Sequence, residues 1–420
     1  MSVRAYCRIP EKKKNTQRSK EGSSPQLLYD LLSELEGCRE IKIAAYLFNN
    51  PIYLEKLIQL ASEGTAIQIT TLPLLGYSNK KLKVDGFEEK ISARELAEEA
   101  FKQLDKTKGI SLSFFPHQYI WYGARYAGGG ASYSFHIKAI LATSATNKDK
   151  CILTSGNFLC TDPYHSDNML VIEEEEPYKS TFINFFKDLK KKSIPSSRFY
   201  KEFTSYTEEF MVSYSGEESS LDANKHRQCF FTAPFINYGE MGSNHFAVNE
   251  LIKIIMKAKR RIWVCAQHFH DITPFDGERD SLIGALYRKY QKNKTVKMRF
   301  LKQVTYRSLS SKDRAARAEM LFSMVMGAEQ RINRLVHDKF IIVDNTLIVS
   351  TANYTASQFA YGVRKMDYLD ENKVKHRKVD NFSEVNAFVV LPAANNLILD
   401  QYIEHFNNLW DTGETIETRL

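Results

Sequence analysis

The feature that most constrains this chain of 420 residues is an internal repeat in the order of its predicted elements. Each half contains an apolar strand, an amphipathic helical stretch and a second apolar strand. These stretches are residues 40–48, 54–60 and 66–70 in the first half, and residues 261–269, 282–290 and 296–300 in the second. Because a chain of this length is expected to form two domains, the repeat predicts a duplicated α/β domain.

Changes in composition along the chain predict the limits of the two domains. Residues 1–24 carry several lysines and form a predicted basic N-terminal arm. Residues 213–224 are polar and mostly small, which is typical of a linker. The boundary is therefore predicted near residue 217, with a first domain of residues 25–216 and a second domain of residues 217–420.

The second half carries a His-x-Lys motif, His337 and Lys339, with Asp344 five residues after the lysine. On a β-strand, residues two apart point to the same face, so the imidazole and the ammonium group are expected to project together. A turn of small residues containing Thr351 and Asn353 follows, and Glu384 precedes a later apolar strand. One strand face therefore offers a nucleophile or acid beside a cation.

The first half repeats this motif with one departure. Its corresponding residues are His136, Lys138, Ser155, Asn157 and Asp167. The position that matches Asp344 holds Thr143. One His-x-Lys pair on a strand is common by chance, whereas two copies in two matched halves are not, so the pair of motifs predicts a functional site.

The two motifs resemble the His-Lys-Asp motifs of the phospholipase D superfamily, and the order of elements extends this resemblance over most of the chain. The resemblance implies two similar α/β domains, each a mixed sheet flanked by helices, packed as a pseudo-dimer around one shared active site. It also implies phosphodiester hydrolysis without a cofactor. No metal-ligand spacing is visible in the sequence, so no metal site is predicted.

The resemblance further implies a role for each motif residue. His136 would be the nucleophile that forms a phosphohistidine and His337 the general acid, although the residues alone do not order the two. The non-bridging phosphate oxygens would be held by the remaining members of both sets, which are Lys138, Asn157, Lys339 and Asn353. The carboxylates that hydrogen-bond the imidazole Nδ1 would be Asp167 and Glu384, and the turn hydroxyls Ser155 and Thr351. Asp344 is interpreted as structural because the first half lacks it, and His165 receives no role.

The motifs constrain the chemistry more than the substrate. The chain has 58 lysine and arginine residues against 50 acidic residues, for a net charge of +8, which favours a polyanionic partner such as nucleic acid. Together with the lysines of residues 12–20, this charge favours a nuclease acting on DNA or RNA. The main alternative is a phospholipase or phosphatidyltransferase, which would also be basic and would bind anionic membranes peripherally.

Two further hypotheses remain open at this stage. A DNA-end repair phosphodiesterase is suggested by Thr143, since tyrosyl-DNA phosphodiesterases lack the motif Asp, but Asp344 argues against a close match. A nucleic-acid-binding protein without catalysis is the other, and the presence of both His-Lys pairs argues against it.

The sequence also predicts where the protein works. No apolar stretch reaches transmembrane length, and no apolar region follows the N-terminus. The six cysteines are scattered without a C-x-x-C pair, which is typical of reduced thiols. A cytoplasmic protein is therefore predicted.

Overall fold

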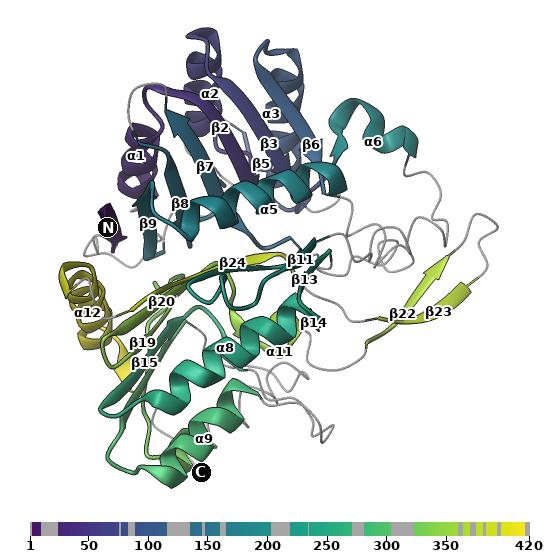
Figure 1. The fold of residues 1–420 in the computed structure, drawn as a ribbon. Helices are drawn as coiled ribbons and strands as arrows, with labels where there is room; N and C mark the ends of the chain where they lie inside the picture. Colours follow the sequence, from purple (N-terminus) through teal and green to yellow (C-terminus); the bar gives the residue numbers. More distant parts are fainter. Residues whose placement is uncertain are drawn as a thin grey trace.

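The computed structural model describes most of the chain. The described residues are 2–9, 24–74, 77–82, 89–115, 135–144, 148–159, 165–202, 219–233, 235–270, 281–303, 323–359, 364–369, 375–380, 384–392 and 396–415. They form two α/β domains, one above the other in Figure 1, and each is built on an eight-stranded mixed sheet flanked by helices. The predicted fold class is thereby confirmed.

The two sheets have the same strand order. The first contains, in spatial order, β1 (Ser2–Arg8), β9 (Asp167–Glu173), β8 (Lys150–Thr154), β7 (Lys138–Ser144), β2 (Cys38–Ala45), β3 (Ala66–Thr71), β6 (Ile110–Phe114) and β10 (Ile194–Pro195). The second contains β12 (Cys229–Thr232), β24 (Asn386–Leu391), β20 (Thr346–Ser350), β19 (Lys339–Val343), β15 (Arg261–Ala266), β17 (Lys297–Lys302), β18 (Glu329–Ile332) and β25 (Glu414–Thr415). Each position of one sheet has a counterpart in the other, as a duplication requires.

Helices flank both sheets. In the first domain they are α1 (Ser24–Glu34), α2 (Pro51–Ser62), α3 (Ala93–Lys106), α5 (Tyr178–Lys192) and α6 (Ser196–Glu202). In the second they are α8 (Ser243–Lys257), α9 (Leu282–Lys292), α11 (Ala356–Phe359) and α12 (Asn396–Asp411). Local sequence sets their starts: Asn50 caps α2 ahead of Pro51, and Ser92 and Glu95 form a capping box at α3.

Short strands complete the described structure. They form small sheets of two or three strands from β4 (Lys81–Leu82), β5 (Ile91–Ser92), β11 (Ser219–Leu221), β13 (Ile236–Tyr238), β14 (Met241–Gly242), β16 (Phe269–His270), β21 (Tyr354–Thr355), β22 (Arg364–Leu369) and β23 (Lys375–Asp380).

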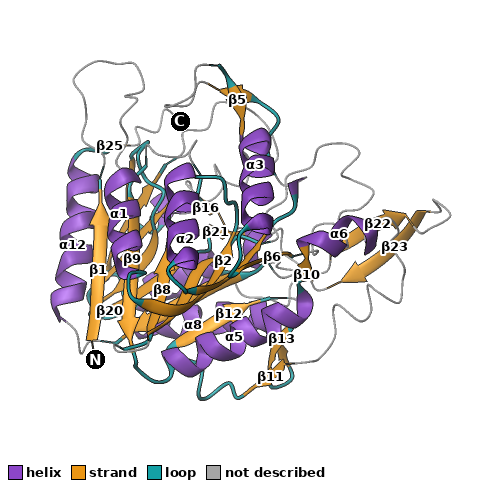
Figure 2. Ribbon diagram, turned by 90° about the horizontal axis from the view of Figure 1, so that it is seen from above, coloured by secondary structure: helices purple, strands orange, loops and turns teal. Residues whose placement is uncertain are grey.

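The domains meet along the strands that carry the motifs. Backbone bridges join Phe135 to Val385 and Ser166 to Val336 across the seam. The C-terminal helix α12 also packs against β1 of the first domain, and the two lie side by side in Figure 2. The seam therefore places the residues just before β7 and β19 beside the opposite domain.

The N-terminal segment differs from the sequence-based prediction. Residues 2–8, assigned above to a basic arm, form the edge strand β1, which pairs antiparallel with β9. Polar contacts add to this pairing, because Arg4 forms ion pairs with Glu34 and Glu173. The boundary predicted near residue 217 lies outside the described residues. Within the described chain, no helix has the length and apolar composition that a membrane crossing requires.

Candidate active site

The two His-x-Lys motifs lie at matching places in the two sheets. Lys138 is the first residue of β7 and Lys339 is the first residue of β19, so each histidine sits just before a central strand. Both lysines are fully buried, and each Nζ donates a hydrogen bond to the carbonyl of its own histidine. Both histidines are buried as well, with His136 4% and His337 3% exposed.

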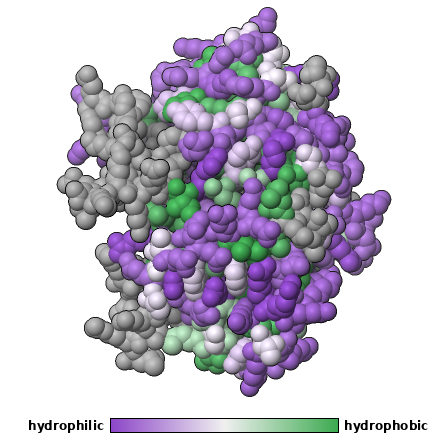
Figure 3. All heavy atoms as spheres, turned by 90° about the vertical axis from the view of Figure 1, so that its left-hand side faces the viewer, coloured by the Kyte–Doolittle hydropathy of each residue, from purple (hydrophilic) through white to green (hydrophobic). Residues whose placement is uncertain are grey.

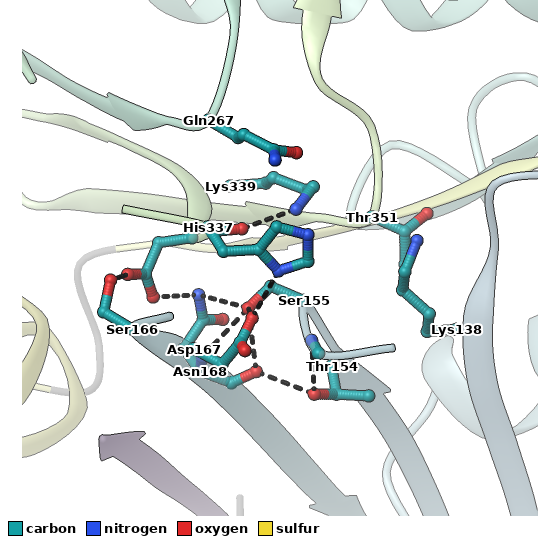
Figure 4. Close-up of polar contacts among 12 residues, drawn as sticks. Lys138, Thr154, Ser155, Ser166, Asp167, Asn168, Gln267, His337, Lys339 and Thr351 are labelled. Atoms are coloured by element: carbon teal, nitrogen blue, oxygen red, sulfur yellow. Dashed lines mark hydrogen bonds and ion pairs between the residues drawn. The ribbon is translucent and has the colours of Figure 1, made fainter. Parts of the chain in front are cut away.

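His337 is held by a carboxylate of the other domain. Its Nδ1 donates to Oδ1 of Asp167, the first residue of β9, at 2.8 Å (Figure 4). The hydroxyl of Ser155 donates to the same oxygen at 2.8 Å and fixes the carboxylate in turn. A carboxylate beside the ring favours the imidazolium form of His337.

His136 is held by a neutral group of the other domain. Its Nδ1 lies 2.8 Å from the carbonyl oxygen of Thr351, and because a carbonyl only accepts, Nδ1 must carry the hydrogen. Burial, followed by the charges of Lys138 and Lys339, lowers the pKa of His136 well below its ordinary value. His136 is therefore neutral at physiological pH, with its lone pair on Nε2.

The turns of small residues carry the remaining motif residues of each domain. Ser155 and Asn157 follow β8, and Thr351 and Asn353 follow β20. The hydroxyl of Thr351 donates to Oδ1 of Asn386 at 3.1 Å, as that of Ser155 does to Asp167. Hydrogen bonds across the seam thus join His136 to Thr351 and His337 to Asp167.

Comparisons with known proteins agree with this arrangement. The family model described as "Cardiolipin synthase, PLD-like domain" matches residues 251–410, which include the second motif. This match and the duplicated fold support membership of the phospholipase D superfamily. No curated protein resembles it closely enough in sequence to count as a match.

One solved structure extends the likeness in fold to both domains. Phosphatidylserine synthase from Haemophilus influenzae Rd KW20 is 10% identical with a TM-score of 0.56, over 98% of this chain and 89% of that one. Likeness at this identity shows the shared fold. The phospholipase D family member Nuc from Salmonella typhimurium is 20% identical with a TM-score of 0.29, over 46% of this chain and 97% of that one.

A longer protein also covers nearly the whole chain. Polyphosphate kinase from Porphyromonas gingivalis is 12% identical with a TM-score of 0.49, over 97% of this chain. This chain spans about half of the kinase's length, since the match covers 50% of it.

Strand register changes one pairing that was expected from the sequence. Thr154 pairs with Met169 and Ser350 with Phe388, so the counterpart of Asp167 is Asn386 rather than Glu384. Glu384 occupies the position of His165 instead, and the Nδ1 hydrogen bond of His136 goes to a backbone carbonyl. The expected pairing of Glu384 with an imidazole Nδ1 is therefore corrected, because the second domain has an amide at the carboxylate position.

Three residues at the site were given no role from the sequence. The ring of His165 stacks on His337 with 5.4 Å between centroids. Tyr46 lies 5.1 Å from the ring of His136 and also 5.1 Å from Nζ of Lys138. Its counterpart in the second domain is Gln267, drawn above Lys339 in Figure 4. The signal that could have found Tyr46 and Gln267 is their place immediately after the strands that pair with the motif strands.

The residue between His337 and Lys339 enters a buried polar network across the seam. Asp338 is fully buried and accepts hydrogen bonds from Ser166, from Asn168 at 2.7 Å and from His405 of α12 at 3.1 Å. Burial alone would raise the pKa of Asp338, but the His405 charge and these hydrogen bonds bring it below its ordinary value. Asp338 is therefore ionised, and it fixes the backbone between two motif residues.

Asp344 lies at the other end of β19, away from the histidines. It adopts a positive φ of 51°, and its carboxylate accepts backbone hydrogen bonds from Lys259, Arg260 and Arg261 at 2.7–3.0 Å. This placement is consistent with its interpretation as a structural residue.

Proposed function

We propose that this chain is a metal-independent phosphodiesterase that hydrolyses nucleic acid through a phosphohistidine intermediate. The observation that carries the proposal is the pair of hydrogen bonds across the seam, from His136 to Thr351 and from His337 to Asp167. Each domain fixes the imidazole of the other through Nδ1, which reserves Nε2 for chemistry. A neutral histidine and a carboxylate-bound histidine are the two protonation states that the reaction needs.

In the first step, the Nε2 lone pair of His136 attacks phosphorus in line. The bond between phosphorus and the leaving oxygen breaks, and that oxygen takes the Nε2 proton of the His337 imidazolium. The two lysines and the amides of Asn157 and Asn353 hold the non-bridging oxygens, where negative charge must be stabilised. The products are a phosphorylated His136, the free alcohol and a neutral His337.

In the second step, water attacks the phosphohistidine. Neutral His337 takes a proton from this water, and the bond between phosphorus and Nε2 breaks. The electron pair returns to His136, and the phosphomonoester leaves. Asp167 stabilises the imidazolium that reforms on His337, so the site returns to its starting state.

Nucleic acid is the proposed substrate because of the basic excess of the chain, with a net charge of +8. Phospholipid is the second candidate. It is favoured by the description of the matching family model, cardiolipin synthase, and by the fold shared with a phosphatidylserine synthase.

Labelled substrates in excess EDTA test the proposal. Single-stranded DNA, duplex DNA, RNA and vesicles containing phosphatidylglycerol are incubated with the purified protein. We expect cleavage of a nucleic acid at a rate that EDTA does not change. Activity that EDTA abolishes and magnesium restores would disprove the metal-independent mechanism, and cleavage of the lipid alone would select the second candidate.

Trapping of the phosphoenzyme tests the two histidine roles. His136→Ala should abolish covalent labelling, whereas His337→Asn should slow turnover by about 10²–10⁴-fold while still labelling His136 from a nitrophenyl ester. His226→Gln changes a buried histidine whose ring contacts Thr181, and it serves as the matched control. Label that survives in His136→Ala and disappears in His337→Asn would reverse the assignment.

A further inference from the structure

A basic pocket lies on the second domain, at the opposite end of β15 from the motif lysines. It has a volume of about 490 Å³, and the cations that line it are Lys259, Arg260, Arg261, Lys297 and Arg299. The remaining lining residues are Trp263 and Thr295, so none of the lining residues is acidic. Arg299 is the cation of this pocket that also contacts a nearby carboxylate, Glu329, at 3.2 Å.

Asp344 fixes the backbone of three residues that line this pocket. Both of its carboxylate oxygens accept backbone N–H groups from residues 259–261, and its own carbonyl accepts Nε of Arg261 at 3.0 Å. The structural aspartate of the motif thus fixes a run of three consecutive cations. Burial, followed by repulsion from Arg260, lowers the pKa of Arg261 below its ordinary value, so an anion bound here would relieve a crowding of positive charge.

Trp263 orders the guanidinium groups. Its ring lies 5.0 Å from the Arg261 guanidinium and 5.3 Å from that of Arg299, and it stacks on Phe406 of α12 at 4.9 Å. Arginines held over aromatic faces lose less conformational freedom when they bind an anion. The pocket is therefore preorganised for phosphate.

The equivalent place in the first domain has a different character. Strand pairing matches Arg261 to Glu40, Trp263 to Lys42 and Arg299 to Gln68. The carboxylate that fixes the loop is also replaced, by Thr143. The duplicated fold does not by itself produce the cluster of cations, and among the described residues the strand positions of Arg261 and Arg299 are basic in the second domain and not in the first.

We propose that this basic pocket is a second phosphate-binding site, which holds the backbone of a nucleic-acid strand whose scissile phosphate lies between His136 and His337. The inference rests on the proposed function. Arg261 and Ala266 are the first and last residues of β15, and at about 3.3 Å per residue they lie roughly 17 Å apart. At about 3.4 Å of helix axis per phosphate, a strand must be some five nucleotides or longer to reach both sites.

The shape of the surface favours a strand over a membrane. A flat bilayer does not enter a concave pocket, and the aromatic ring in the lining is engaged by Phe406 and two arginines. Figure 3 views the side of the molecule on which α12 lies. Its described surface is mostly hydrophilic, with apolar residues in small separate groups rather than in one broad patch.

The test compares two double variants of the full chain in EDTA. Arg260→Ala/Lys297→Ala removes two cations of the pocket. Arg39→Ala/Lys108→Ala removes two exposed cations of the first domain, and Arg39 is the strand counterpart of Arg260. Binding of a fluorescent 30-nucleotide single strand is titrated over a range of salt concentrations, and hydrolysis of bis(p-nitrophenyl) phosphate reports on the active site alone.

We expect the pocket variant to bind the strand about tenfold more weakly at low salt, with a salt slope smaller by about 1.4 for two lost phosphate contacts. The control variant should bind at least several-fold more tightly than the pocket variant. Equal affinity of the pocket variant and the parent protein would overturn the proposal. So would loss of binding to phosphatidylglycerol vesicles with no change in binding to the strand.

These outcomes separate the second site from the proposed function. A parent protein that fails to hydrolyse the small ester and any nucleic acid would refute the proposed function, while the strand titration would still decide whether the pocket binds phosphate. Conversely, the parent protein could hydrolyse its substrates while the pocket variant binds the strand as tightly as the parent. That result would support the proposed active site and refute the second phosphate-binding site.

Discussion

The two domains share one fold and strand order, yet they carry charge at different places. The first domain has the carboxylate Asp167 beside the histidine of its partner, and the second has the amide Asn386 there. Conversely, the second domain has two carboxylates, Asp338 and Asp344, where the first has Ile137 and Thr143. The shared backbone therefore fixes where the two imidazoles lie, and the unshared charges determine how each one ionises.

This difference is what the proposed two-step reaction at a symmetric site requires. Two identical histidines would have equal affinity for the proton, so neither would be reserved as nucleophile. Asp167 favours a charged His337, whereas burial and the charges of two nearby lysines favour a neutral His136 and outweigh its hydrogen bond to the Thr351 carbonyl. Breaking or transferring this asymmetry should therefore have the largest effect on catalysis.

The first prediction replaces the carboxylate of Asp167 and the amide of Asn386, one at a time. Asp167→Asn keeps an acceptor for Nδ1 of His337 but removes the charge, so we expect hydrolysis to slow by about 10²-fold or more for esters with poor leaving groups. Asn386→Asp brings a carboxylate towards His136 and should move the acidic limb of the pH–rate profile upwards by about one unit. Rates measured from pH 4 to 9 with nitrophenyl and alkyl esters check both effects.

The double exchange sharpens the comparison. If local charge assigns the roles, Asp167→Asn/Asn386→Asp should transfer part of the trapped phosphoryl label from His136 to His337. A double variant that stays labelled on His136 alone, at the rate of Asp167→Asn, would mean that geometry rather than charge assigns the nucleophile.

The sequence was sufficient for the parts of this arrangement that repeat. The duplicated order of elements and both His-Lys-Asn sets follow from periodicity and motif spacing, because they depend on neighbours along the chain. Asn386 was missed, since its equivalence to Asp167 depends on strand register, and Glu384 stands only two residues away. The contact between Asp338 and His405 joins residues 67 positions apart, so no local pattern could reveal it.

The second prediction concerns stability at the seam. Asp338→Asn removes a buried charge and replaces the carboxylate that His405, Asn168 and Ser166 contact, which should lower the free energy of unfolding by about 3 kcal/mol. Ile137→Val, at the apolar counterpart, should cost only about 1 kcal/mol. Urea unfolding of both variants at pH 7 measures the difference, and equal losses would show that the buried carboxylate adds nothing to the stability of the seam.

The lowered pKa of Asp338 predicts how its contribution to stability changes with pH. Because the pKa of Asp338 is lower in the folded protein than in the unfolded chain, its contribution is complete above the ordinary value of 3.8 and is lost as the pH falls through the folded value. Asp338→Asn should therefore lose less stability than the parent protein on going from pH 5 to pH 3. A variant with the same acid sensitivity as the parent would assign acid unfolding to other groups.

The third and smallest effect concerns the ends of β19 and β7 that lie away from the histidines. Asp344→Asn keeps the shape of a residue that tolerates positive φ, but it replaces a charged acceptor of three N–H groups by a neutral one. We expect a loss of about 1 kcal/mol at pH 7. Thr143→Asp, at the counterpart position, should change the free energy of unfolding by no more than about 0.5 kcal/mol. The described contacts of Thr143 include no comparable set of backbone N–H groups that a carboxylate could accept.

Strand binding by Asp344→Asn then distinguishes anchoring from charge. The substitution adds one net positive charge beside the basic pocket, so a purely electrostatic effect would strengthen binding of the 30-nucleotide strand. If Asp344 acts by fixing the backbone of residues 259–261, the three cations become less well placed and binding should weaken despite the added charge. We expect the weaker binding. Tighter binding with unchanged stability would show that Asp344 only reduces the positive charge near the pocket and does not position the three cations.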